Sequence, residues 1–167
     1  CFGNTTMAAI HGMDVEGIRA NWKDAEACAT VSAPRRFPTH SVGIDISGNA
    51  VNYGKSAGLF DEVHEADLNQ PAPETEKAIE KAMTNADIVI STASLVYLDP
   101  PAIEKLIDAF ASGSGEGYML VNFLNPFALE KADATKRMLL DRLEFVGSTA
   151  SRHRRMSPLE QENYPGE

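Results

Sequence analysis

Three polar residues lie at the ends of short apolar runs that are typical of buried β-strands: Asp45, Asp67 and Ser91. A carboxylate can accept hydrogen bonds from both hydroxyls of a ribose, and ionised acceptors form the stronger bonds. Asp67 could accept a hydrogen bond from an exocyclic adenine amine, with Leu68 against the ring. The small side chain of Ser91 leaves room for a ligand. Because open parallel sheets bind ligands at the carboxyl ends of their strands, these positions predict a nucleoside site.

Each of these residues also has a structural interpretation. Asp45 could cap a helix, although Ser47 is better placed for that role, which leaves Asp45 for a ligand. Asp67 could be a solvated loop acid, because such acids are common on protein surfaces. Ser91 and Thr92 could simply end a strand.

A turn near the start of the chain adds a further candidate, made of Phe2, Gly3 and Asn4. A glycine in a turn that leads into a helix lets a ligand approach the backbone closely, and the helix N–H groups point at negative charge. An ordinary tight turn explains the same residues, so both interpretations stay open.

The elements that must position these residues alternate between helices and strands. The predicted strands are residues 41–46, 60–66, 86–92, 118–123 and 143–149. The predicted helices begin near Asn4, Asp14, Ser47, Glu74, Asp99 and Leu129. We expect the second helix to bury Val15, Ile18 and Trp22, and the apolar run 88–90 to be a central strand covered on both faces.

This order predicts an α/β fold with a doubly wound, mostly parallel sheet flanked by helices. Such a sheet starts with a strand, so we expect the first strand to lie upstream of Cys1. Residues 1–150 are predicted to form one domain. Residues 151–167 are polar, and they either belong to the last hairpin or are disordered.

The composition argues against nucleic-acid and membrane partners. The chain has 15 Lys and Arg against 24 Asp and Glu, and its formal charge of -9 repels phosphate backbones. No stretch approaches the roughly 20 apolar residues that cross a bilayer. Two cysteines without a signal peptide, and no Cys/His group with zinc-ligand spacing, predict a cytoplasmic protein without a metal. The basic cluster Arg152–Arg155 is either a solvated segment or a contact for phosphate or an acidic substrate.

The order of several sequence pieces resembles that of the class I S-adenosylmethionine-dependent methyltransferases, over most of residues 1–149. The pieces are VGIDIS (42–47) with NAVNYGKSAGLFDEV (49–63), ADL (66–68), ADIVISTASLVYL (86–98) and GYMLVNF (117–123). The resemblance implies a Rossmann-like methyltransferase fold with S-adenosyl-L-methionine as cofactor.

The resemblance also implies roles for the candidate residues. Asp45 would bind the ribose hydroxyls, with Ile46 packing on the adenine. Asp67 and Leu68 would contact the adenine, and Ser91 would lie near the methionine end of the cofactor.

Gly3 would be the last glycine of the cofactor loop. Two departures weaken that assignment: the upstream half of the glycine-rich motif is absent, and Gly3 and Asp45 are separated by more than the roughly 20 residues usual in dinucleotide sites.

The implied reaction is in-line methyl transfer to a small-molecule acceptor. Such a displacement mainly needs close, aligned reactants, and a base only if the acceptor must lose a proton. No residue is an evident base, although Tyr97, Asn122 and His153 could lie beside the acceptor. One alternative is an NAD(P)-dependent oxidoreductase, but no Gly-x-Gly-x-x-Gly and no Tyr-x-x-x-Lys occurs. A second alternative is a non-catalytic binding or scaffold module. The oligomeric state is open.

Overall fold

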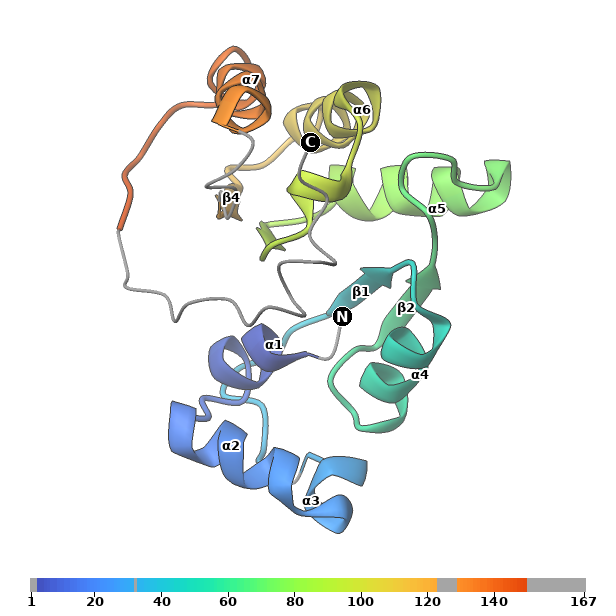
Figure 1. Ribbon diagram of the computed structural model, residues 1–167, viewed down its shortest axis with the longest axis vertical. Coiled ribbons are helices and arrows are strands. Elements are labelled where there is room, and N and C mark those ends of the chain that lie inside the picture. Colours follow the sequence, from blue (N-terminus) through green and yellow to red (C-terminus); the bar gives the residue numbers. More distant parts are fainter. Residues whose placement is uncertain (1–2, 32, 123–128, 150–167) are drawn as a thin grey trace. The chain divides into compact units, whose positions relative to one another are not determined.

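The computed structural model describes residues 3–31, 33–122 and 129–149 of a mixed α/β protein (Figure 1). The chain divides into two compact units, Cys1–Ile79 and Glu80–Glu167, and each is described by itself. Phe2, the cluster Arg152–Arg155 and the polar segment 151–167 lie outside the described residues.

The first unit contains three helices, then a strand, a helix and a strand. Their bounds are α1 Asn4–Ala9, α2 Val15–Lys23, α3 Ala25–Ala29, β1 Val42–Asp45, α4 Gly48–Ser56 and β2 Glu62–Glu65. Helix α5, Pro73–Thr84, runs from this unit into the next. Residues 33–40 form neither helix nor strand, as Pro34 and Pro38 predict.

Capping side chains set the starts of α2, α3 and α4. Asp14 accepts a hydrogen bond from the Gly17 N–H (2.7 Å), and Ser47 accepts one from the Ala50 N–H (3.3 Å). The expectation that Ser47 rather than Asp45 caps α4 is therefore confirmed. For α1 the N-cap is Gly3, without a side-chain hydrogen bond, and the helix begins at Asn4 as predicted.

β1 and β2 form a parallel pair with Val42 opposite Glu62 and Asp45 opposite Glu65. Helix α4 packs against both strands (Figure 1). The core of this unit is built from buried hydrophobic side chains of α1 and of the residues that follow α4: Met7, Ala57, Leu59 and Phe60. The absence of a side chain at Gly43 admits the Phe60 ring, because a Cβ there would come 2.8 Å from Phe60 Cδ2.

The expected buried face of α2 is wrong in part. Val15 and Trp22 are exposed, and Asn21 is buried in their place. Trp22 lies against Tyr53, with ring centroids 5.4 Å apart, at the rim of the core. An indole carries a polar N–H, which favours such a rim position over full burial.

A hydrogen-bonded network closes the amino ends of β1 and β2. Arg35 Nη1 donates to Asp61 Oδ2 (2.7 Å) and to the Thr39 carbonyl (2.6 Å). The Ser41 N–H and hydroxyl also donate to Asp61 Oδ2, at 2.7 and 3.0 Å. Partial burial would raise the pKa of Asp61, but the hydrogen bonds from Arg35 and Ser41 outweigh it and lower the pKa to about 2.

The second unit contains a second parallel pair. Its elements are β3 Ile88–Ser91, the 3-10 helix η1 Leu95–Tyr97, α6 Pro100–Ala111, β4 Tyr118–Val121 and α7 Leu129–Leu140. Asp99 is the N-cap of α6 and prolines fill its first turn, so the interpretation of this stretch as a helix start is confirmed. Arg142, just after α7, binds Glu104 and Asp108 of α6.

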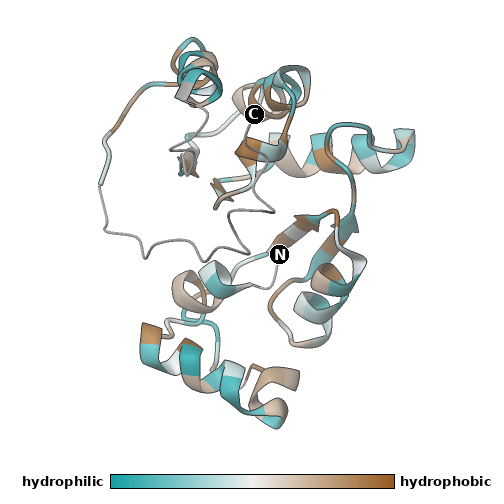
Figure 2. Ribbon diagram, in the orientation of Figure 1, coloured by the Kyte–Doolittle hydropathy of each residue, from teal (hydrophilic) through white to brown (hydrophobic). Residues whose placement is uncertain are grey.

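Helix α6 has a buried stripe formed by Ala102, Ile103, Ile107 and Phe110. In Figure 2 the helices carry both teal and brown residues, as expected for helices with one buried face. Within the described residues, every helix is too short or too polar to span a bilayer.

Two expectations for the second unit are not met. Ile88, Ile90, Tyr118 and Leu120 share one face of the β3–β4 pair and are 43–58% exposed, so the described residues do not cover β3 on both faces. The predicted last strand, 143–149, is not a strand. A short apolar run needs a neighbouring strand to satisfy its backbone groups, and none of the described strands pairs with it.

Candidate functional site

The register of β1 and β2 brings two of the predicted ligand-binding residues to the same edge of this strand pair. Asp45 is the last residue of β1 and lies opposite Glu65, the last residue of β2. The Ala66 N–H donates to the Asp45 carbonyl (2.9 Å), which continues the pairing one step beyond β2. Asp67 follows directly. The structure thus places Asp45 and Asp67 at the carboxyl ends of neighbouring parallel strands, with Asp67 two residues beyond the partner of Asp45.

Both aspartates form the same local turn. Asp45 Oδ1 accepts a hydrogen bond from the Ser47 N–H (2.9 Å), and Asp67 Oδ1 accepts one from the Asn69 N–H (3.0 Å). Side-chain bonds of this kind, two residues along, shape the backbone as a β-turn does. They give each aspartate a structural role and also restrict the direction of its carboxylate.

Sequence analysis missed a third carboxylate at this edge. Glu65 ends β2, and its carboxylate lies against the backbone of Gly48, the first residue of α4, where a Cβ would collide with it. An anion at the start of a helix is favourable, because the helix N–H groups point toward it. The available signal was an acidic residue two positions before Asp67, at the end of the predicted strand.

Apolar side chains flank the two aspartates. Ile46 follows Asp45 and is 66% exposed, and Leu68 follows Asp67 and is half-buried. A large exposed aliphatic side chain beside a carboxylate suits an aromatic ring whose other end is polar. The predicted adenine contacts of Ile46 and Leu68 stay predictions.

Contacts within the fold explain the residues of the turn at Gly3. Gly3 is buried with a φ of 75°, and a Cβ on it would collide with Leu59 of the core. Only glycine adopts such a φ without strain. Asn4 Oδ1 accepts a hydrogen bond from Trp22 Nε1 (2.7 Å). These contacts account for both residues without a ligand, and their cofactor roles stay predictions.

Ser91 lies in the other unit, at the carboxyl end of β3. Its hydroxyl is 2.6 Å from that of Ser94, and its carbonyl accepts a hydrogen bond from the Asn122 N–H (3.3 Å) just after β4. Among the predicted acceptor-side residues, Tyr97 is exposed in η1 and Asn122 is half-buried. The third, His153, lies outside the described residues.

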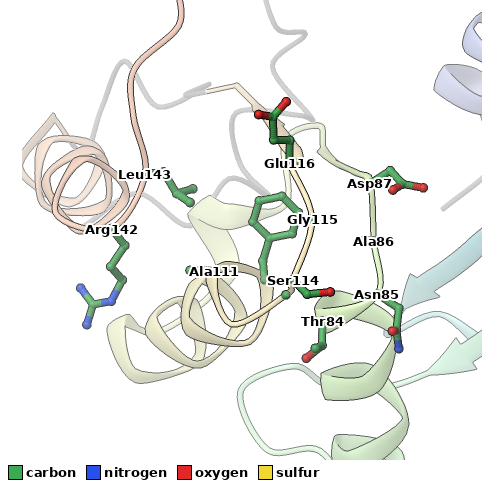
Figure 3. A pocket seen from close by; sticks show the side chains of 13 residues that line it. Thr84, Asn85, Ala86, Asp87, Ala111, Ser114, Gly115, Glu116, Arg142 and Leu143 are labelled. Carbon is green, nitrogen blue, oxygen red and sulfur yellow. The ribbon is translucent and has the colours of Figure 1, made fainter.

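A hollow of about 320 Å³ lies at the opposite ends of β3 and β4. The residues before each strand line it, together with Arg142 and Leu143. Figure 3 shows the charged groups of Asp87, Glu116 and Arg142 pointing in different directions, and Arg142 is bound to Glu104 and Asp108. Charged groups that do not converge give a ligand no common point of attachment, so the hollow is not the candidate site.

No protein-family model, no curated protein and no solved structure matches the chain. The structure itself establishes an α/β protein with two short parallel strand pairs. The strongest candidate site is the edge formed by Asp45, Glu65 and Asp67.

Proposed function

We propose that the protein is an S-adenosylmethionine-dependent methyltransferase whose nucleoside site is the carboxyl edge of β1 and β2. The observation that carries the proposal is the set of three carboxylates, Asp45, Glu65 and Asp67, at the ends of two neighbouring parallel strands. Carboxylates are acceptors only, which matches the hydroxyls of a ribose and the amine of an adenine. The doubly wound sheet belongs to the same proposal, with these strand pairs as its parts.

The charge of this edge favours S-adenosylmethionine over a nicotinamide dinucleotide. S-adenosylmethionine carries a sulfonium, an ammonium and one carboxylate group and is positively charged overall, whereas the dinucleotide carries an anionic pyrophosphate. Three carboxylates at one edge attract the first ligand and repel the second.

The residues at this edge would bind and orient the cofactor. Asp45 would accept hydrogen bonds from the ribose diol, and Asp67 would accept one from the adenine amine, with Ile46 and Leu68 against the ring. The bound cofactor would supply a methyl group bonded to a positively charged sulfur. Transfer forms a bond from the acceptor's lone pair to the methyl carbon, while the carbon–sulfur bond breaks and its electron pair stays on sulfur.

The acceptor is proposed to be a small molecule. The formal charge of -9 opposes the approach of a nucleic-acid backbone. Because alignment supplies most of the rate enhancement in such a displacement, the chain needs no strong base for an acceptor that is already nucleophilic.

Calorimetric titration of the full chain tests the proposal. We expect S-adenosylmethionine and its demethylated product S-adenosylhomocysteine to bind, and NAD not to bind. Asp67→Asn keeps an oxygen for the Asn69 N–H but removes the charge, and should weaken binding about tenfold, roughly 1.4 kcal/mol. Asp87→Asn, an exposed aspartate before β3, is the matched control and should bind as the wild type does.

Two results would contradict the proposal. Binding of NAD without S-adenosylmethionine would favour the oxidoreductase alternative. Binding of neither ligand by a folded full-length chain would favour a scaffold module.

A further inference from the structure

The start of helix α4 takes its acidic group from a neighbouring strand. Helices α2, α3 and α5 each carry a glutamate in their own first turn, whereas the first turn of α4 contains no acidic residue. The carboxylate of Glu65, at the end of β2, lies against Gly48 instead, and a Cβ on Gly48 would come 2.8 Å from Glu65 Cδ. An anion is favourable there because the N–H groups of a first turn point toward it. The glycine therefore makes room for the carboxylate that α4 itself lacks.

The same helix start orients Asp45, the residue that we propose for ribose binding. The Ser47 N–H, next to Gly48 in the chain, donates to Asp45 Oδ1 (2.9 Å). The Ser47 hydroxyl accepts a hydrogen bond from the Ala50 N–H of α4 (3.3 Å). Asp45 lies opposite Glu65 in the register of the strand pair, and all of these residues belong to the first unit. A change in the first turn of α4 would therefore reach Asp45 through Ser47.

We infer that Glu65 is a positioning residue: its carboxylate orders the first turn of α4 and so fixes the Ser47 N–H that orients the Asp45 carboxylate. This role rests on the proposed function in one respect, that Asp45 binds the ribose of an adenosine ligand. Glu65 acts through Gly48 and Ser47 without touching that ligand.

Two single substitutions in the full chain displace the same carboxylate. Glu65→Ala removes it, and Gly48→Ala places a Cβ where it lies, although alanine is the better helix former. Each should weaken binding of S-adenosylhomocysteine about fivefold, because a misplaced binding group lowers affinity. The double variant should bind no more weakly than Glu65→Ala alone, since residues in one contact are not additive. Unchanged binding by Glu65→Ala, or fully additive losses, would overturn the inference.

An acid within α4 itself separates positioning from direct contact with the ligand. Asn49→Asp, at an exposed position in the first turn, returns a negative charge to the helix start. Combined with Glu65→Ala, it should restore binding to within about twofold of the wild type. Failure to recover would overturn the inference, because it would mean that Glu65 binds the ligand itself. Glu16→Ala, which removes a first-turn glutamate from α2, is the matched control and should leave binding unchanged.

Amide hydrogen exchange in the ligand-free chain tests the positioning role without any ligand. Exchange at Ser47 should be at least about threefold faster in Glu65→Ala than in the wild type, because its N–H donates to Asp45 only in the ordered turn. Equal rates would overturn the inference. A wild-type chain that binds no adenosine ligand would end the proposed function, whereas faster exchange in the variant would still support the role of Glu65 at the start of α4.

Discussion

The two ends of the β1–β2 pair differ in which groups contact their carboxylates. At the amino end, the carboxylate of Asp61 is matched by Arg35 and by two donors of Ser41. At the carboxyl end, Asp45 and Asp67 accept backbone N–H bonds two residues along the chain, and Glu65 lies against a helix start. The same two strands thus end in a neutralised network on one side and in an anionic edge on the other.

Under the proposed function, this difference separates residues that stabilise the fold from residues that bind the ligand. A carboxylate that is hydrogen-bonded to a guanidinium and a buried serine stabilises the native state. Carboxylates at the carboxyl ends of parallel strands lie where open α/β sheets bind ligands. We therefore expect substitutions at the amino end to change stability and substitutions at the carboxyl end to change binding.

The largest expected effect is on stability, at the amino end. Asp61→Ala leaves the N–H of Ser41 without its acceptor and removes the carboxylate that Arg35 binds, which should lower the free energy of unfolding by about 2 kcal/mol. Chemical denaturation followed by circular dichroism measures the change. The folded fraction should still bind S-adenosylhomocysteine normally. A loss below about 0.5 kcal/mol, the range of an ordinary surface substitution, would contradict the role of this network.

The second effect is on binding, at the carboxyl end. Asp45→Asn keeps an oxygen for the Ser47 N–H but loses the charge, so affinity for S-adenosylhomocysteine should fall about tenfold, or roughly 1.4 kcal/mol. The free energy of unfolding should stay within about 0.5 kcal/mol of the wild type. Calorimetry and denaturation on the same samples make the comparison, with Asp61→Asn as control. Lower stability with unchanged affinity would reverse the assignment of the two ends.

The smallest expected effect is the pH dependence of the stability that Asp61 contributes at the amino end. The pKa of Asp61 is about 2 in the native state against an ordinary value of 3.8, so the unfolded chain takes up a proton first as the pH falls. The stabilisation is present above pH 3.8 and is lost between 3.8 and about 2. After a discount for the 36% exposure of Asp61, it amounts to about 1 kcal/mol.

The difference in unfolding free energy between wild type and Asp61→Asn measures the stabilisation that the charge of Asp61 contributes. It should be constant from about pH 7 down to about pH 5 and then shrink toward about pH 2. A difference that does not change with pH would mean that the charge of Asp61 contributes nothing.

Local signals in the sequence predicted most of the elements. The cap at Ser47, the prolines at 100 and 101, and the apolar runs at 42–45 and 88–91 each act within a few residues, so their effects can be read without a fold. The position of Asp45 at a strand end followed from the same local pattern. Gly58, with a φ of 77° just after α4, is a glycine at the position where helices commonly end.

The remaining features depend on contacts between distant parts of the chain. Glu65 is part of the candidate site because the register pairs it with Asp45. In the second unit, the Ala93 N–H donates a hydrogen bond to Asn122, which lies 29 residues further along the chain. The run at 143–149 has strand-forming residues, yet a strand forms only where another strand offers its backbone groups. The sequence alone determined where most of the helices and strands could begin, because capping and periodicity are local. Only the tertiary structure decided which side chains share an edge, because pairing joins residues whose separation along the chain carries no local signal.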